Sequence, residues 1–135
     1  MVTWWTSWKP SWAHSDWTDA AAMKEPPRFH VDVDQDHAGA TVTVTGDVDM
    51  ATIARLELAR EKALAGSPTR LLIDLRGVRF IDSSGLKFLI ETDRLSRTDG
   101  WKLQLVRPAE SAMRVLHVTG VEKYLPFVEP GDVAS

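Results

Sequence analysis

The sequence predicts an α/β protein with a small mixed, mostly parallel sheet of about four or five strands and helices packed on it. The first observation is that short strand-like stretches alternate with amphipathic helical stretches over 29–135. The second is that 70–106 reads as strand, helix and strand, an order that requires a parallel pair with a right-handed connection. The third is the length of 135 residues, which fits one domain because domains usually contain about 100–200 residues.

An antiparallel hairpin opens the predicted sheet. Phe29, Val31 and Val33 alternate with polar residues, a polar turn follows at 36–39, and alternation resumes from Val42. A period of two is typical of strands with one buried face. The hairpin therefore adds an antiparallel edge to the parallel part of the sheet.

Two amphipathic helices follow. The stretch 52–65 has apolar residues at helical spacing and ends at Gly66-Ser67-Pro68. The stretch 84–98 has the same spacing and ends at Asp99-Gly100. Gly and Pro directly after a periodic apolar pattern mark the ends of helices.

The remaining elements are shorter. In chain order we expect a strand at 70–75, a connector at 76–79, a strand at 101–106, a helix at 108–118, a helical turn at 121–125 and a strand at 127–128. The apolar run Leu71-Leu72-Ile73 suits a strand buried on both faces. Pro108 suits the first turn of a helix, where its missing N–H has no partner to lose.

The first 28 residues differ from the rest of the chain. They contain five of the six tryptophans, interleaved with Ser, Thr and Pro, and show no helical or alternating period. We expect a disordered leader over 1–28 and a folded domain over 29–135. Two alternatives stay open: an aromatic peptide that docks on a partner or a membrane interface, or translated sequence upstream of a start at Met23.

Composition excludes several classes of function. The net charge of −3 disfavours general nucleic-acid binding. The absence of cysteine removes disulfides, zinc–thiolate sites and thiol nucleophiles and fits the reducing cytoplasm. No secretory signal pattern is present, and no apolar run approaches the ~18 residues of a transmembrane segment. The sequence has no Gly-rich phosphate loop and no metal-ligand spacing of histidines, so we expect neither a cofactor nor a metal.

The most unusual stretch is Phe80-Ile81-Asp82-Ser83-Ser84-Gly85-Leu86. It opens a predicted helix after a predicted parallel strand, where open α/β sheets usually meet ligands and partners. One interpretation is a helix cap by Asp82 or Ser83, worth about 1 kcal/mol. A second is a regulatory serine, because a phosphate on Ser83 adds about −1.5 to −2 charges beside Asp82. A partner surface shaped for a neutral hydroxyl would then be repelled.

A third interpretation of the same stretch is a nucleophilic serine. A triad can be drafted from Ser83, Asp93 or Asp99, and His117. The G-x-S-x-G elbow of α/β-hydrolases is incomplete, however, because Ile81 stands where the first glycine belongs. The chain is also short for that fold, so we disfavour hydrolase activity.

The body of the chain resembles the STAS domain, specifically bacterial anti-sigma factor antagonists. The resemblance spans about 29–128 and rests on Thr45-Gly46-Asp47-Val48-Asp49 and on Leu72-Ile73-Asp74-Leu75 through the D-S-S-G-L motif at 82–86. It implies the STAS fold and a regulatory binding protein that is a kinase substrate, not an enzyme. It also implies that a partner, both anti-sigma factor and serine kinase, phosphorylates Ser83. The unphosphorylated form binds this partner and frees a sigma factor, and a serine phosphatase resets the switch.

The resemblance extends to the partner-binding surface. Asp47 and Asp49 match the acidic turn beside the phosphorylated serine and are expected to contact the kinase. From the position of the motif, we expect Asp82 to cap or orient the loop. The other expected contacts are Ser84, Gly85 and Lys87, with Ser84 and Gly85 opening the helix and Lys87 accompanying the phosphate. The main alternative is a STAS scaffold that binds partners without phosphorylation; the disfavoured one is the small serine hydrolase.

Overall fold

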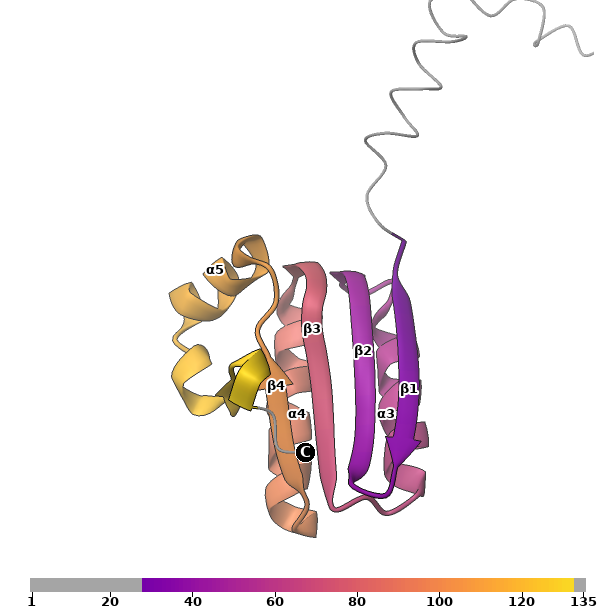
Figure 1. The fold of residues 1–135 in the computed structure, drawn as a ribbon. Helices are drawn as coiled ribbons and strands as arrows, with labels where there is room; N and C mark the ends of the chain where they lie inside the picture. The colour runs from indigo at the N-terminus through magenta and orange to yellow at the C-terminus, as the bar shows by residue number, and fades with distance from the viewer. Residues whose placement is uncertain (1–27, 133–135) are drawn as a thin grey trace, which may run out of the picture.

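The computed structural model describes residues 28–132 (Figure 1). Its strands are β1 (His30–Asp36), β2 (Gly39–Val48), β3 (Arg70–Ile81), β4 (Lys102–Val106) and β5 (Phe127–Val128). Its helices are α3 (Ile53–Ala65), α4 (Ser83–Asp99) and α5 (Glu110–Thr119), followed by the short 3₁₀ turns η2 (Glu122–Tyr124) and η3 (Pro130–Asp132). The expectations for the Trp-rich leader and for a start at Met23 fall on 1–27, outside the described residues.

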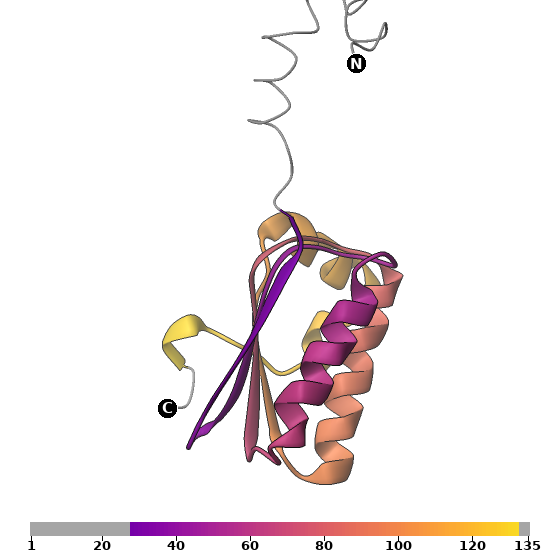
Figure 2. The same ribbon diagram turned by 90° about the vertical axis from the view of Figure 1, so that its right-hand side faces the viewer.

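The strands form one five-stranded sheet in the order β1-β2-β3-β4-β5. β1 pairs antiparallel with β2, and every other neighbouring pair is parallel. Figure 2 shows α3 and α4 side by side on one face of this sheet. The predicted mixed, mostly parallel sheet with packed helices is therefore confirmed; the ends of the helices differ by one or two residues, while β3 is longer than predicted.

The core lies between the sheet and its helices. Alternate residues of β2 and β3, such as Val44 and Ile73, point inward and are fully buried. α3 contributes Leu56 and two small residues, Ala59 and Ala63, which let it approach the sheet closely. This packing brings both helix starts to the edge of the sheet at which the parallel strands end.

The predicted connector at 76–79 is wrong, because β3 continues as a strand to Ile81. The register between β2 and β3 shifts twice, between Thr43 and Thr45 and between Gly46 and Asp47. Such bulges break the alternation of buried side chains by which a strand is recognised in a sequence. Gly77 belongs to this irregular part, where an added Cβ would lie 2.5 Å from the Cγ2 of Thr45.

The second half of β3 extends beyond the end of β4 and is accompanied by α5 instead. The Ala109 N–H donates to the Val78 carbonyl at 3.0 Å, and the Ser111 hydroxyl donates to the Arg79 carbonyl at 2.7 Å. α5 begins at Glu110, so Pro108 precedes the helix and does not form its first turn. These tertiary contacts hold the extended end of β3, and with it the start of α4.

An ion pair on β3 makes the stability of the fold depend on pH. The Arg76 guanidinium donates to both carboxylate oxygens of Asp74, at 3.0 and 2.7 Å, and the Arg76 backbone N–H adds a third bond at 3.0 Å. The guanidinium is the main cause that lowers the pKa of Asp74, against the opposing effect of burial. The pKa of Asp36 is lowered mainly by the backbone N–H groups of Ala38 and Gly39 in the hairpin turn.

Asp74→Asn is expected to reduce the loss of stability at acidic pH. The folded-state pKa of Asp74 lies below its unfolded value of about 3.9. The ionised carboxylate therefore stabilises the fold above that pH, and this stabilisation is lost as the pH falls through the folded pKa. Urea unfolding from about pH 6 to about pH 2 should show a smaller drop in the free energy of unfolding for Asp74→Asn than for the wild type. An unchanged drop would contradict the role of Asp74 in the pH dependence. Asp36, whose pKa is also lowered, accounts for part of the drop that remains in the variant.

Candidate modification and partner-binding site

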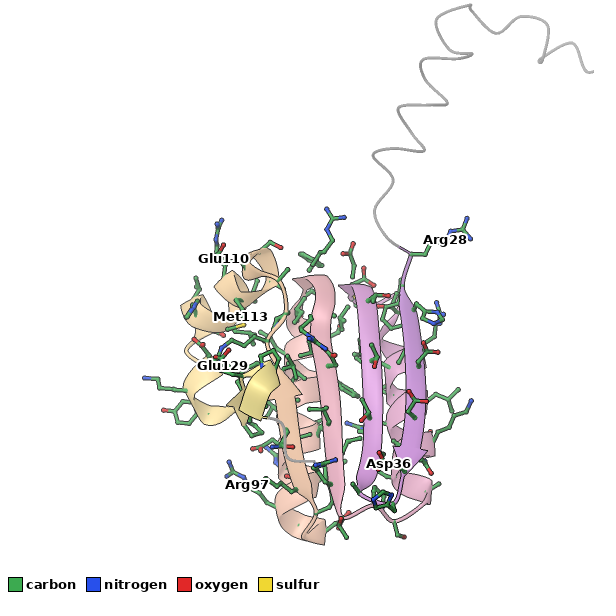
Figure 3. All side chains as sticks on the ribbon, in the orientation of Figure 1. Arg28, Asp36, Arg97, Glu110, Met113 and Glu129 are labelled. Atoms are coloured by element: carbon green, nitrogen blue, oxygen red, sulfur yellow. The ribbon has the colours of Figure 1, made fainter. Side chains whose placement is uncertain are left out.

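Two parallel strands end side by side and bring two loops together. Val48 of β2 and Ile81 of β3 are register partners, and the Asp82 N–H donates to the Val48 carbonyl at 3.1 Å. The loop before α3 and the junction before α4 therefore adjoin each other. Figure 3 shows Asp36 at the opposite end of the sheet from this edge, where Arg28 and Glu110 are labelled.

Asp82 caps α4. Its backbone is extended, and one carboxylate oxygen accepts hydrogen bonds from the N–H groups of Ser84 at 2.8 Å and Gly85 at 3.3 Å. These are N–H groups that a helix start otherwise leaves without partners. The negative charge also lies favourably at the positive end of the helix dipole. Asp82 therefore stabilises the conformation of the loop that contains Ser83.

Ser83 is the first residue of α4, and its side chain is exposed. Within 28–132, its hydroxyl makes no hydrogen bond, and the N–H groups of Ser84 and Gly85 are bonded to Asp82. Ser84 differs, since it is half-buried and lines a groove between α3 and α4. Of the two adjacent serines, Ser83 is the one presented to an approaching enzyme.

Most polar groups of the acidic turn at the end of β2 are hydrogen-bonded within the turn itself. The Asp49 carboxylate accepts from the N–H groups of Ala51 at 2.9 Å and Thr52 at 3.2 Å. The Thr52 hydroxyl accepts from the Asp49 N–H at 3.0 Å and donates to the Asp47 carbonyl at 2.8 Å. Asp49 therefore holds the turn that precedes α3, whose N-cap residue is Thr52. The Asp47 carboxylate has no hydrogen bond or ion pair within the described part of the chain.

Two further residues expected at the partner surface differ from each other in environment. Gly85 is buried, and a Cβ there would lie 2.6 Å from Ile81 Cγ2 and 2.9 Å from Val48 Cγ1. It lets α4 pack directly on the ends of β2 and β3 and is not available for contact with a partner. Lys87 is exposed, and its Nζ lies 3.9 Å from Glu91 Oε1 on the next turn of the helix.

The hydrolase triad does not assemble among the described residues. Asp93 and Asp99 follow Ser83 on the same helix, at about 15 and 24 Å along an axis that rises 1.5 Å per residue. His117 lies on α5, and its Nδ1 is 2.7 Å from Glu122 Oε1. Over 28–132 there is also no metal-ligand cluster and no helix long and apolar enough to cross a membrane.

Sequence reasoning missed two surface residues at this edge. Met50, in the loop after β2, is 81% exposed, and Phe80, near the end of β3, is 47% exposed. Met50 directly follows the motif at 45–49, and Phe80 belongs to the motif at 80–86. An apolar residue in a sequence is, however, ordinarily assigned to the core. Their exposure follows only from the three-dimensional structure.

Comparisons with known proteins agree with this fold. A family model described as STAS_2 (Mlab, STAS domain) matches residues 31–129. The anti-sigma-F factor antagonist RsfB of Mycobacterium tuberculosis (strain ATCC 25618 / H37Rv) is 32% identical over 102 residues, which cover 75% of this chain and 82% of the relative.

Solved structures give the same result. The crystal structure of an anti-sigma factor antagonist from Mycobacterium paratuberculosis matches with a TM-score of 0.67 and 32% identity, over 76% of this chain and 86% of that chain. SpoIIAA shares the fold, with a TM-score of 0.61 and 14% identity for its unphosphorylated form, over 78% of this chain and 91% of that chain. For the phosphorylated form of this Bacillus protein, the TM-score is 0.57 at 15% identity, over 78% and 95%. The chain therefore belongs to the STAS domain family, among relatives named anti-sigma factor antagonists.

Proposed function

We propose that this protein is an anti-sigma factor antagonist controlled by phosphorylation of Ser83. In its unphosphorylated form it binds an anti-sigma factor that is also a serine kinase, and this binding frees a sigma factor. The kinase inactivates the antagonist by phosphorylating Ser83, and a serine phosphatase restores it. The protein acts in the cytoplasm, where sigma factors meet RNA polymerase, and is itself a substrate without catalytic residues.

The observation that carries the proposal is the environment of Ser83. Its hydroxyl is exposed at the start of α4 and unengaged within the described residues, while Asp82 holds the surrounding loop by two hydrogen bonds. A kinase can therefore reach the hydroxyl without unfolding the loop. The relatives named anti-sigma factor antagonists supply the class of partner.

Phosphorylation changes the charge of this surface more than its shape. Asp82 already occupies the N–H groups of Ser84 and Gly85, so a phosphate of about −1.5 to −2 charges would find those donors taken. The new charge would add to those of Asp82 and Asp47 at the same edge. Like charges brought together at an interface cost several kcal/mol, enough to release a bound partner. That SpoIIAA, a protein of the same fold, is known in both forms supports a switch that leaves the fold intact.

The proposal is tested by phosphorylation with defined kinases. The purified chain is incubated with Mg-ATP and, one at a time, with each anti-sigma factor kinase encoded in the genome of its source. Intact-mass and peptide analysis should find a single phosphate on Ser83 with at least one of them. Ser83→Ala should remain unmodified, and the matched control Ser84→Ala should be modified as in the wild type.

Two results would overturn the proposal. A phosphate on Ser84 and not on Ser83 would show that the exposed hydroxyl is not the acceptor. A stable complex with one of these proteins, with no phosphate formed under any condition, would indicate a phosphorylation-independent STAS scaffold.

A further inference from the structure

Two large apolar side chains are exposed at the same end of the sheet as Ser83. Met50 follows Val48 by two residues in the loop after β2, and Ser83 follows Ile81, the register partner of Val48, by two residues. Phe80 lies one residue before Ile81 on β3. All three residues therefore stand at one edge of the sheet, within a few residues of the same register pair.

Within residues 28–132, these apolar side chains take no part in the hydrophobic core. Neither Met50 nor Phe80 belongs to the hydrophobic core or to the partly buried side chains packed against it. Single exposed apolar residues are common on protein surfaces, but exposed aromatic and Met side chains are enriched where proteins bind one another. Two of them at the end of the sheet that carries an accessible serine therefore favour a contact with a partner there.

A carboxylate that has no partner in the described part of the chain lies next to Phe80. Asp47 and Phe80 are register partners on neighbouring strands, which are about 4.8 Å apart. Their successors Val48 and Ile81 are buried, so Asp47 and Phe80 share the opposite face because side chains alternate along a strand. A partner that covers Phe80 also covers the Asp47 carboxylate. Since an unpaired buried charge is costly, this partner must supply a cation.

We propose that Met50 and Phe80 are the apolar anchors by which the unphosphorylated protein holds its serine kinase partner. The facing surface of the kinase is apolar and carries one Lys or Arg that pairs with Asp47. This inference rests on the proposed function and adds the residues that supply affinity. It also explains how a phosphate on Ser83 releases the partner. The Lys or Arg of the partner is already paired with Asp47, so the phosphate would lose its water against an apolar surface with no cation to compensate its charge.

The test measures affinity with the kinase that phosphorylates Ser83 in the experiment above, held in its ADP-bound form. Isothermal titration compares the wild type with Met50→Ala and Phe80→Ala. The matched control is Val118→Ala, because Val118 is 81% exposed, as Met50 is, but lies near the end of α5. Thermal unfolding of each variant checks that the fold is retained.

We expect each anchor variant to weaken binding at least about tenfold, as interface hot spots do, while Val118→Ala binds like the wild type. Asp47→Asn should weaken binding and reduce its dependence on salt concentration, because one ion pair is lost. If the wild type binds and is phosphorylated but both anchor variants bind equally well, the inference is wrong and the proposed function stands. If the wild type neither binds nor is phosphorylated by any of the kinases, the proposed function fails and the anchors fail with it.

Discussion

Ser83→Asp is expected to weaken binding of the kinase partner by at least about 100-fold, since like charges at an interface cost several kcal/mol. The aspartate places a permanent carboxylate beside Asp82, whose own oxygen already holds the N–H groups of Ser84 and Gly85. The fold should be unaffected, because an acidic residue in the first turn of a helix is usually favourable by about 0.3–1 kcal/mol. Titration calorimetry measures the affinity, and thermal unfolding measures the stability.

The matched control is Ser67→Asp. Ser67 is exposed in the turn between α3 and β3, just before the start of β3 and far from its end. Its φ of 50° is a left-handed conformation that Asp tolerates better than most residues. This variant changes the net charge by the same amount and should bind like the wild type. Equal losses in both variants would mean that overall charge, and not the charge at position 83, controls the interaction.

Gly85→Ala is expected to destabilise the protein by about 1–3 kcal/mol, the usual cost of overpacking. The added Cβ would lie 2.6 Å from Ile81 Cγ2 and 2.9 Å from Val48 Cγ1, closer than real contacts allow. Both neighbours are buried strand residues that cannot move aside. Alanine gains up to about 1 kcal/mol of helix propensity over glycine, and we expect the steric cost to exceed this gain. Denaturant unfolding measures the difference.

The same substitution should also lower the rate at which Ser83 is phosphorylated. Relief of the clash moves the start of α4 away from the sheet and displaces the loop at 82–83, so the rate of Ser83 phosphorylation should fall as well. Gly131→Ala is the control, because nothing lies within 4 Å of a Cβ at that position. If Gly85→Ala is as stable as the wild type and is phosphorylated at the same rate, the close packing of α4 on β2 and β3 has no functional importance.

The order of strands and helices could be predicted because most elements carry their own periodicity. The helices expected at 52–65 and 84–98 are α3 and α4 with their ends moved by one residue, since Gly and the N-terminal cap are local signals. The two-residue β5 was also predicted where it stands. The extended half of β3 could not be predicted, because its bulges remove the alternation and its partners, Asp47 and α5, come from elsewhere in the chain.

For the site, the sequence identified the serine motif, because D-S-S-G-L at a strand–helix junction is a local pattern. The sequence could not show which side chains are hydrogen-bonded within the loops and which are available to a partner. Asp49 and Asp47 look equivalent in the sequence, yet the Asp49 carboxylate accepts two backbone hydrogen bonds in the turn before α3. Within the described residues the Asp47 side chain accepts none, and its backbone carbonyl accepts one from the Thr52 hydroxyl. Gly85 was expected among the partner contacts and is buried instead.

The sequence by itself determined the class of fold, the family and the position of the serine motif, because these depend on periodicity, caps and motifs that lie within a few consecutive residues. Only the tertiary structure decided which side chains surround Ser83. Two loops that are about thirty residues apart meet through the pairing of Val48 with Ile81, a long-range contact that no local pattern encodes. Gly85 is buried against that pair, whereas Met50 and Phe80 are exposed near it, and these environments set the surface that a partner meets.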